Sequence, residues 1–347
     1  MKKIVSRVLC NLALASFSLF SSTLASADNL STWPGSGTSS NADKKNAFGK
    51  NVSGLFFQAA ANSKPAVVWA VKNAPSILYK LGWDGKNYVS DSSNGWSEGK
   101  SMAYTDGKGA PDAEGVTMAE LSENAVYVVS ERDGNQDSVN RFSILRYDLS
   151  GTSSTLRASH EWNFTAAMPT NTPVNKGPEA ITWVPDSYLT QAKFYDEHKK
   201  TLYQPQNYAN HGSGLFFVGM ENTGTIYAFA LNYADASYTL IATIASGETA
   251  IMELSFDRDN QVLWAHCDDT CKNHNHLLTV DDKKNSSTAG KFIVQKGYQR
   301  PSDLPDYNFE GIGIAPETEC KNGQKPFLWA NDKHVIWQSN IKCGALF

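Results

Sequence analysis

A unit of about sixty residues occurs five times in this sequence, and this repeat strongly limits the folds that the chain can adopt. Each unit opens with a short apolar run, and these runs begin at positions 53, 114, 179, 253 and 310. The starts are separated by 61, 65, 74 and 57 residues. The third unit is the longest because it contains an insertion at residues 187–211 that is rich in Tyr, Gln, Asn and Lys.

The runs inside each unit follow a constant order. The second run is β-branched and aromatic and breaks into Asn, Asp or Glu, as in residues 126–133 (VYVVSERD). A third run of similar composition mostly ends in turn residues, and a fourth run separates one unit from the next. Four short antiparallel strands per repeat, placed around a circle, form the blades of a β-propeller.

The fifth unit lacks a fourth run of its own, because the chain ends after residues 334–347. Its outer strand must come from elsewhere, and the segment around residues 30–33 is the natural donor, since pairing there closes the ring and removes two sheet edges. The sequence therefore predicts an all-β propeller of five blades. A ring of six blades and a β-sandwich with coincidental similarity are the alternatives.

The first 27 residues have the pattern of a signal peptide. Residues 2–7 contain three basic side chains, residues 8–20 form an apolar run too short to span a bilayer, and residues 25–27 (ASA) suit a signal peptidase. We expect export to the periplasm or the medium, and a single propeller domain over residues 28–347.

Charge and hydropathy argue against two classes of partner. Removal of the leader's three basic residues leaves 28 Lys+Arg against 35 Asp+Glu, and this net charge of −7 is unfavourable for nucleic-acid binding. No later run of about 18 apolar residues exists, so we expect no membrane span. The expected partner is a small molecule or an envelope-derived ligand, bound by a monomer.

The remaining cysteines form an even set after the leader: Cys267, Cys271, Cys320 and Cys343. An even count in an exported chain predicts two disulfides. We expect one between Cys267 and Cys271 across a tight loop, and one that ties Cys343 back to Cys320. A zinc site is the alternative for the first pair, because His274 and His276 follow closely.

Glutamates recur at the starts of four opening runs, while the first run starts with Ser53-Gly54: Glu114, Glu179, Glu253 and Glu310. The innermost strand of each blade lines the central channel, so these side chains should surround one channel mouth. The turn between the second and third strands lies on the same face. Polar residues there should stand around the rim: Asn73, Glu131, Asp133, Glu221, Asn222, Asp268, Asn331 and Asp332.

Carboxylates gathered at one mouth repel one another and resist burial in the charged form. Protonation, pairing with Lys or Arg, or a bound divalent cation can compensate. Few basic residues lie nearby, and hard oxygen ligands suit Ca²⁺, so we predict calcium. The alternative is that the glutamates are structural latches that accept backbone N–H groups from the adjacent blade. Gly115 and Gly311, next to two of them, should allow close backbone approach at the crowded axis.

Two segments carry a family resemblance: residues 112–134 (DAEGVTMAELSENAVYVVSERDG) and 308–317 (NFEGIGIAPE). They resemble the esterase-like domain related to β-propeller phytases, and are similar to the periplasmic propellers described as SdiA-regulated. The resemblance implies a propeller with calcium held by acidic groups at the channel mouth, which map to Glu114, Glu179, Glu253 and Glu310. In phytases it implies phosphomonoester hydrolysis by metal-activated water.

Two functions follow from these observations. The first is a calcium-dependent hydrolase of a phosphoester, ester or lactone at the channel mouth, because several acidic residues converge there. The second is a non-catalytic propeller that binds a glycan, peptide or cell-envelope component, with calcium only bracing the channel. It is motivated by the lack of a serine-hydrolase motif such as G-x-S-x-G. The sequence assigns no catalytic residue.

Overall fold

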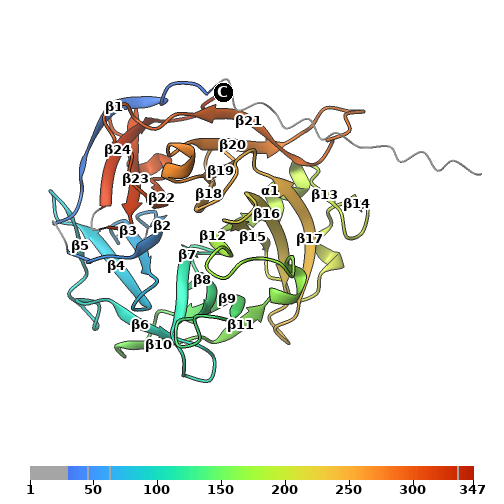
Figure 1. Cartoon of the computed structure of the whole chain (residues 1–347). Helices are drawn as coiled ribbons and strands as arrows, with labels where there is room; N and C mark the ends of the chain where they lie inside the picture. The colour runs from blue at the N-terminus through green and yellow to red at the C-terminus, as the bar shows by residue number, and fades with distance from the viewer. Residues whose placement is uncertain (1–29, 45–46, 62–63, 334–335) are drawn as a thin grey trace, which may run out of the picture.

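Five antiparallel sheets stand around a central axis in the computed structural model (Figure 1). It describes residues 30–44, 47–61, 64–333 and 336–347, so the predicted signal peptide lies outside the described residues. Each sheet has the four-strand blade plan expected from the repeat, and the predicted five-bladed β-propeller is confirmed.

From the axis outwards, the blade strands follow chain order, except that β1 is the outermost strand of blade 5. Blade 1 contains β2 (Val52–Gln58), β3 (Val67–Lys72), β4 (Ile77–Trp83), β5 (Tyr88–Ser90) and β6 (Lys100–Ala103). Blade 2 contains β7 (Pro111–Thr117), β8 (Ala125–Asp133), β9 (Asn140–Asp148) and β11 (His160–Asn163). Blade 3 contains β12 (Pro178–Pro185), β15 (Gly214–Met220), β16 (Thr225–Leu231) and β17 (Tyr238–Ala245).

Blades 4 and 5 follow the same plan. Blade 4 contains β18 (Glu253–Asp257), β19 (Val262–His266), β20 (Asn275–Val280) and β21 (Phe292–Tyr298). Blade 5 contains β22 (Phe309–Ile314), β23 (Gln324–Asn331), β24 (Ile336–Lys342) and β1 (Gly35–Asn41). In blade 1, β5 and β6 share the outer position, and β10 (Thr155–Arg157) from the next repeat adds in parallel to β6.

The connections contain the few remaining elements. The insertion of the third unit forms α1 (Asp186–Gln191), a two-stranded ribbon of β13 (Tyr195–Asp196) and β14 (Thr201–Leu202), and the 3₁₀ turn η2 (Pro205–Asn207). The other 3₁₀ turns are η1 (Thr165–Ala167), η3 (Asp269–Cys271) and η4 (Glu317–Glu319). Among the described residues, no helix has the length and apolar character needed to cross a membrane.

The core lies between the faces of neighbouring blades. Every residue of β15 and β19 is buried, because these second strands are covered on both faces. Between blades 4 and 5, Trp264 and Trp329 are fully buried and pack with Trp33 and Phe327. The second-strand tryptophans therefore fill the interface between two blades, and each such ring buries about 150–250 Å².

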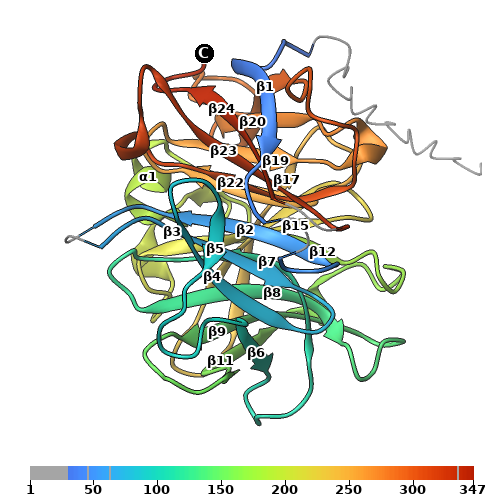
Figure 2. The same cartoon turned by 90° about the vertical axis from the view of Figure 1, so that its left-hand side faces the viewer.

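The ring closes through β1, which pairs antiparallel with β24 and lies beside it in both views (Figures 1 and 2). The N-terminal segment therefore closes blade 5 as predicted, but the strand begins later than residues 30–33. Pro34 explains the shift, because it has no N–H to give to a sheet. Trp33 instead enters the core, and its Nε1 donates to the carbonyl of Asn340 at 2.9 Å.

The inner strands touch at the axis through three glycines. A Cβ atom on Gly311 would lie 2.2 Å from the carbonyl oxygen of Ser53, one on Gly54 would lie 2.6 Å from that of Glu114, and one on Gly115 would lie 2.9 Å from that of Glu179. A side chain at these positions would clash with the next blade's backbone. The close approach expected of Gly115 and Gly311 is thus confirmed, and it brings the starts of neighbouring inner strands together.

Candidate metal centre

Five carboxylates meet at the channel mouth in two overlapping groups. Oxygens of Asp112, Glu114 and Glu131 lie within 4.8 Å of one another, and so do oxygens of Glu131, Glu179 and Glu221. Asp112 and Glu114 belong to β7, Glu131 to β8, Glu179 to β12, and Glu221 directly follows β15. Glu131 is shared by both groups and is 1% exposed, so the cluster joins blades 2 and 3 below the surface.

Irregular strand pairing positions these side chains. The register between β7 and β8 shifts on either side of Ala113, and that between β8 and β9 shifts between Ser130 and Arg132, where Glu131 lies. A similar shift surrounds Glu179 at the start of β12, and another surrounds Glu310 at the start of β22. A β-bulge re-aims the extra residue and ends regular pairing. The glutamates can therefore turn toward the mouth instead of following the alternation of the strand.

Burial and mutual repulsion perturb the ionisation of the cluster. Burial first, then the charges of Asp112, Glu131 and Glu310, raise the pKa of Glu114 well above its ordinary value. Burial and the charge of Glu114 do the same to the pKa of Glu179. Burial raises the pKa of Glu131 to about 7 and that of Glu310 to about 8. At neutral pH, Glu114, Glu179 and Glu310 therefore hold protons unless a cation replaces them, whereas Glu131 is partly ionised.

Oxygens of Asp112 and Glu114 lie within 4.8 Å of each other, and so do oxygens of Glu131 and Glu179. A hydrogen bond between two carboxyl groups requires a proton on one of them. Protonation, the first compensation expected from the sequence, is therefore open to the same side chains that offer oxygen ligands to a cation.

Basic side chains compensate the edge of the cluster and, through Arg132 Nη1 at 3.9 Å, Glu131. Arg132 Nε lies 2.7 Å from Asp112 Oδ2, and Lys176 Nζ lies 2.5 Å from Glu221 Oε1. Within the described residues, no Lys or Arg forms a salt bridge with Glu114, Glu179 or Glu310. The deeper carboxyls therefore have only protons or a bound cation to balance their charge.

Glu253 has a different position from the other three predicted ligands. Its Oε1 accepts the N–H of Leu254 and its Oε2 accepts that of Leu55 in blade 1, both at 3.0 Å. It pairs regularly with His266 on β19, without a register shift. Glu253 thus acts as the latch that was the alternative to metal binding.

The structure brings Glu114 and Glu179 into the cluster and places Glu310 beside it. Glu310 accepts a hydrogen bond from Asn308 Nδ2 at 2.8 Å, and its charge acts on both Glu114 and Glu179. Glu310 belongs to neither carboxylate triad. Blades 2 and 3 therefore provide the carboxylates of the centre, and Glu310 of blade 5 lies at its border.

The predicted rim residues divide into two sets. Glu131 and Glu221 join the cluster, and Asn73 Nδ2 donates to Glu114 Oε1 at 3.2 Å. Asn73 Oδ1 is buried and has no hydrogen-bond partner among the described residues. The rest lie at strand ends and in turns: Asp133 accepts the N–H of Asn135, Asp268 that of Thr270 and Asn331 that of Lys333, while Asp332 lies near Glu310 and Asn222 is exposed.

Asp112 also belongs to the cluster, although it was not among the residues predicted from the sequence. It precedes Glu114 by two positions, and this spacing puts both side chains on the same face of a strand. The D-x-E spacing was the available signal. Only the second unit has it, because Gly177, Ile251 and Asn308 occupy the equivalent positions two residues before the other glutamates.

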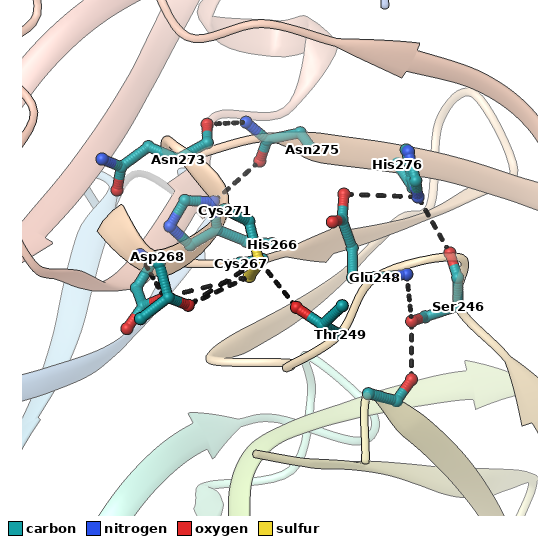
Figure 3. The surroundings of a disulfide bond; sticks show 12 residues. Ser246, Glu248, Thr249, His266, Cys267, Asp268, Cys271, Asn273, Asn275 and His276 are labelled. Carbon is teal, nitrogen blue, oxygen red and sulfur yellow. Dashed lines mark hydrogen bonds and ion pairs between the residues drawn. A yellow bond between two sulfur atoms is a disulfide. The ribbon is translucent and has the colours of Figure 1, made fainter. Parts of the chain in front are cut away.

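Both predicted disulfides are present, between Cys267 and Cys271 and between Cys320 and Cys343. The first pairing takes the two thiols that the zinc alternative requires. Figure 3 shows its surroundings, where Thr249 lies beside Cys271 and the carboxylate of Glu248 lies 3.3 Å from His276 Nδ1. His276 Nδ1 is also 3.0 Å from the carbonyl of Ser246, so its ring is engaged by the preceding loop.

Comparisons with known proteins do not assign a family. No family model and no curated protein match the sequence. Similar solved structures include a chain of a nidogen/laminin complex, with 11% identity, TM-score 0.37, and coverage of 82% of this chain and 73% of that chain. A chain of a mitotic checkpoint complex has 10% identity, TM-score 0.36, and coverage of 96% and 99%. A glucose dehydrogenase has 11% identity, TM-score 0.42, and coverage of 87% and 99%. The fold assignment rests on the chain's own sheets.

Proposed function

We propose that this protein is an exported propeller that binds Ca²⁺ at the channel mouth through Asp112, Glu114, Glu131 and Glu179. The observation that carries the proposal is Glu131, a buried carboxyl shared by two carboxylate triads. Asn73 Oδ1, a buried oxygen without a hydrogen-bond partner among the described residues, adds a neutral ligand at the same place. A divalent cation would replace the protons that these acids otherwise hold.

The donor set favours calcium over other common metals. All the candidate ligands are carboxylate or amide oxygens, whereas zinc and copper sites usually include His or Cys. Magnesium requires near-ideal octahedral geometry and keeps several waters. Calcium accepts six to eight oxygens in loose geometry, which suits side chains that come from several strands.

We further propose that the centre supports hydrolysis of a phosphoester, ester or lactone. A bound divalent cation polarises such a substrate and lowers the pKa of a bound water. The support is the gathering of perturbed acids at one end of the channel, which is typical of functional sites. A second candidate is a non-catalytic propeller in which the ion only braces the blades. Glu253 favours it, because this glutamate already serves as a brace.

Export is part of the proposal. The leader pattern over residues 1–27 supports it, and so do two disulfides, which persist in oxidising compartments. Edman sequencing of the protein purified from periplasm or medium should show an N-terminus near Asp28. Recovery from the cytoplasm with Met1 intact would contradict export.

Calorimetric titration of the chelator-treated protein with CaCl₂ and MgCl₂ tests the metal centre. Wild type should bind calcium more tightly than magnesium, and Glu131→Gln should lose that binding while the exposed Glu98→Gln retains it. Absence of calcium binding by wild type would overturn the proposal. Turnover of p-nitrophenyl phosphate, p-nitrophenyl acetate or γ-butyrolactone should require calcium. Calcium binding without turnover of any of them would reject the hydrolase and leave the brace.

A further inference from the structure

A groove lies where blade 1 meets blade 5, and we call it the seam groove. Its volume of about 450 Å³ falls in the usual range for ligand sites, about 300–1,000 Å³. Blade 1 contributes Trp83 and Tyr88, while blade 5 contributes Gln324, Gln338 and Asn340. The groove therefore has one aromatic wall and one wall of amide side chains.

The seam groove begins where the core between these two blades ends. Leu328 and Ile336 of blade 5 are fully buried in that core. Along β24, the same face continues from Ile336 to Gln338 and Asn340, because alternate residues share a face. The apolar face becomes polar as the strand leaves the core. The two blades remain adjacent, but the polar side chains on these faces do not pack into a water-free contact.

Trp83 forms an exposed aromatic surface on the opposite wall. It is 51% exposed at the end of β4, although tryptophan is mostly buried on average. Its ring lies 5.0 Å from that of Tyr88, its cross-strand partner, which is only 5% exposed. The buried Tyr88 ring supports Trp83 and restricts its rotation. A supported apolar ring that faces solvent beside a groove is a typical ligand platform.

The facing amides are available for hydrogen bonds. Gln324, Gln338 and Asn340 are partly exposed, and no hydrogen bond engages their side chains within the part of the chain that the structure describes. Each amide offers both donors and an acceptor. The groove can therefore match a ligand whose polar groups both donate and accept, as hydroxyl groups do.

The charged residues that line the seam groove further restrict the class of ligand. One acid, Glu319, and one base, Lys321, line the edge of the seam groove, so it has no excess of either sign. Both flank Cys320, which the disulfide to Cys343 ties to the end of blade 5. This edge is covalently held in place. A neutral groove favours an uncharged ligand over a phosphate or a strongly charged peptide.

We propose that the seam groove binds a neutral glycan, with a sugar ring on Trp83 and its hydroxyls hydrogen-bonded to Gln324, Gln338 and Asn340. A pyranose ring combines a flat C–H face with a rim of hydroxyls, and this matches an aromatic surface opposite amides. A proline-rich peptide fits less well, because such peptides dock on grooves lined by several aromatic rings. Here Tyr88 and Phe57 are buried, and Trp83 is the exposed ring of the groove.

The glycan site is independent of the metal centre. Asn73, which follows β3, contacts Glu114 at the mouth, so β4 starts near the mouth and ends at Trp83 on the opposite face. β24 likewise starts beside the mouth turn that contains Asn331 and runs toward Asn340. Glycan binding should therefore continue in chelator, and failure of the hydrolase proposal would leave this one intact.

Titration with uncharged hexasaccharides tests the inference, using maltohexaose, cellohexaose, xylohexaose, mannohexaose and chitohexaose. Calorimetry should detect binding of at least one, unchanged by EDTA. Trp83→Ala should weaken it at least tenfold, since truncation of a central tryptophan anchor is worth about 2 kcal/mol or more. Gln338→Ala should weaken it less, and Trp83→Phe should retain part of it. The control Tyr307→Ala removes a ring of similar exposure, 47%, and should change nothing.

Three outcomes would overturn the inference. One is the absence of binding to all five sugars at millimolar concentration. Another is binding that survives Trp83→Ala unchanged in a variant whose melting curve matches wild type. The third is binding of a proline-rich peptide that requires Trp83 while none of the sugars binds, because the groove would then be a peptide site.

Discussion

Replacing Glu131 with glutamine should stabilise the metal-free protein at alkaline pH. The pKa of this carboxyl is about 7 in the folded protein and 4.5 ordinarily, and burial is the main cause. The folded state then binds the proton more tightly than the unfolded state, so stability is lost as pH rises from 4.5 to 7. A tenfold change in proton affinity is worth about 1.36 kcal/mol, which makes the loss about 3 kcal/mol.

Glu131→Gln avoids this loss because the amide does not ionise. Its Oε1 can still accept the N–H of Gly177, which lies 2.5 Å from the glutamate oxygen. With an unfolding entropy of about 2.1 cal/mol/K per residue over roughly 300 residues, about 3 kcal/mol corresponds to about 5 °C in melting temperature. In EDTA at pH 8, the variant should melt about 5 °C above wild type, and at pH 4 the two should coincide.

Calcium should reverse the order of stability, so that wild type melts above Glu131→Gln. A ligand at a hundred times its dissociation constant stabilises the folded state by about 2.7 kcal/mol, and Glu131→Gln should gain far less than wild type. Differential scanning fluorimetry at pH 4, 6 and 8, with EDTA or CaCl₂, measures both effects, and the exposed Glu98→Gln serves as the control. The reasoning is refuted if Glu131→Gln in EDTA is no more stable at pH 8 than wild type, or if the difference does not change with pH.

Three further predictions concern the axis and the cation. Gly311→Ala should abolish folding or lower the melting temperature sharply, because its Cβ would lie 2.2 Å from Ser53 O. The control Gly313→Ala on the same strand meets only ordinary contacts at 3.4 Å and should be tolerated. Thermal unfolding followed by circular dichroism measures both effects. Glu253→Ala leaves buried N–H groups unpaired and should destabilise the protein by about 3 kcal/mol or more in chemical denaturation; a loss below 1 kcal/mol would contradict the latch. Calcium binding at pH 7 should release protons from the cluster, so its heat should vary with the ionisation enthalpy of the buffer, and a buffer-independent heat would show that the acids are already ionised.

The fold could be predicted from the sequence because the same order of strands occurs in all five repeats. The predicted opening run 253–257 coincides with β18, and the other opening runs differ from their strands by a few residues. The closing strand was placed too early because an isolated apolar Trp33 looks like strand sequence, while Pro34 sets the true start. The fourth run of the second unit, residues 154–162, divides between β10 in blade 1 and β11 in blade 2, which its sequence does not indicate.

The sequence predicted a carboxylate centre at the channel mouth, but not which residues belong to it. The recurring glutamates pointed to one mouth, yet whether a side chain reaches it depends on a β-bulge, and bulges leave little trace in a single sequence. Glu253 carries the same residue type at the same place in the repeat, but its regular pairing with His266 directs it to backbone N–H groups. Asp112 was missed because its unit alone carries it.

Glu253 should also affect how the propeller unfolds. Its carboxyl joins backbone N–H groups of β18 in blade 4 and β2 in blade 1, which are not neighbours in the ring, so displacing either blade from the axis breaks a buried hydrogen bond. Linear repeat proteins can lose end units one at a time because each unit contacts only its neighbours. This ring has a hub, and its blades should melt in a single cooperative transition.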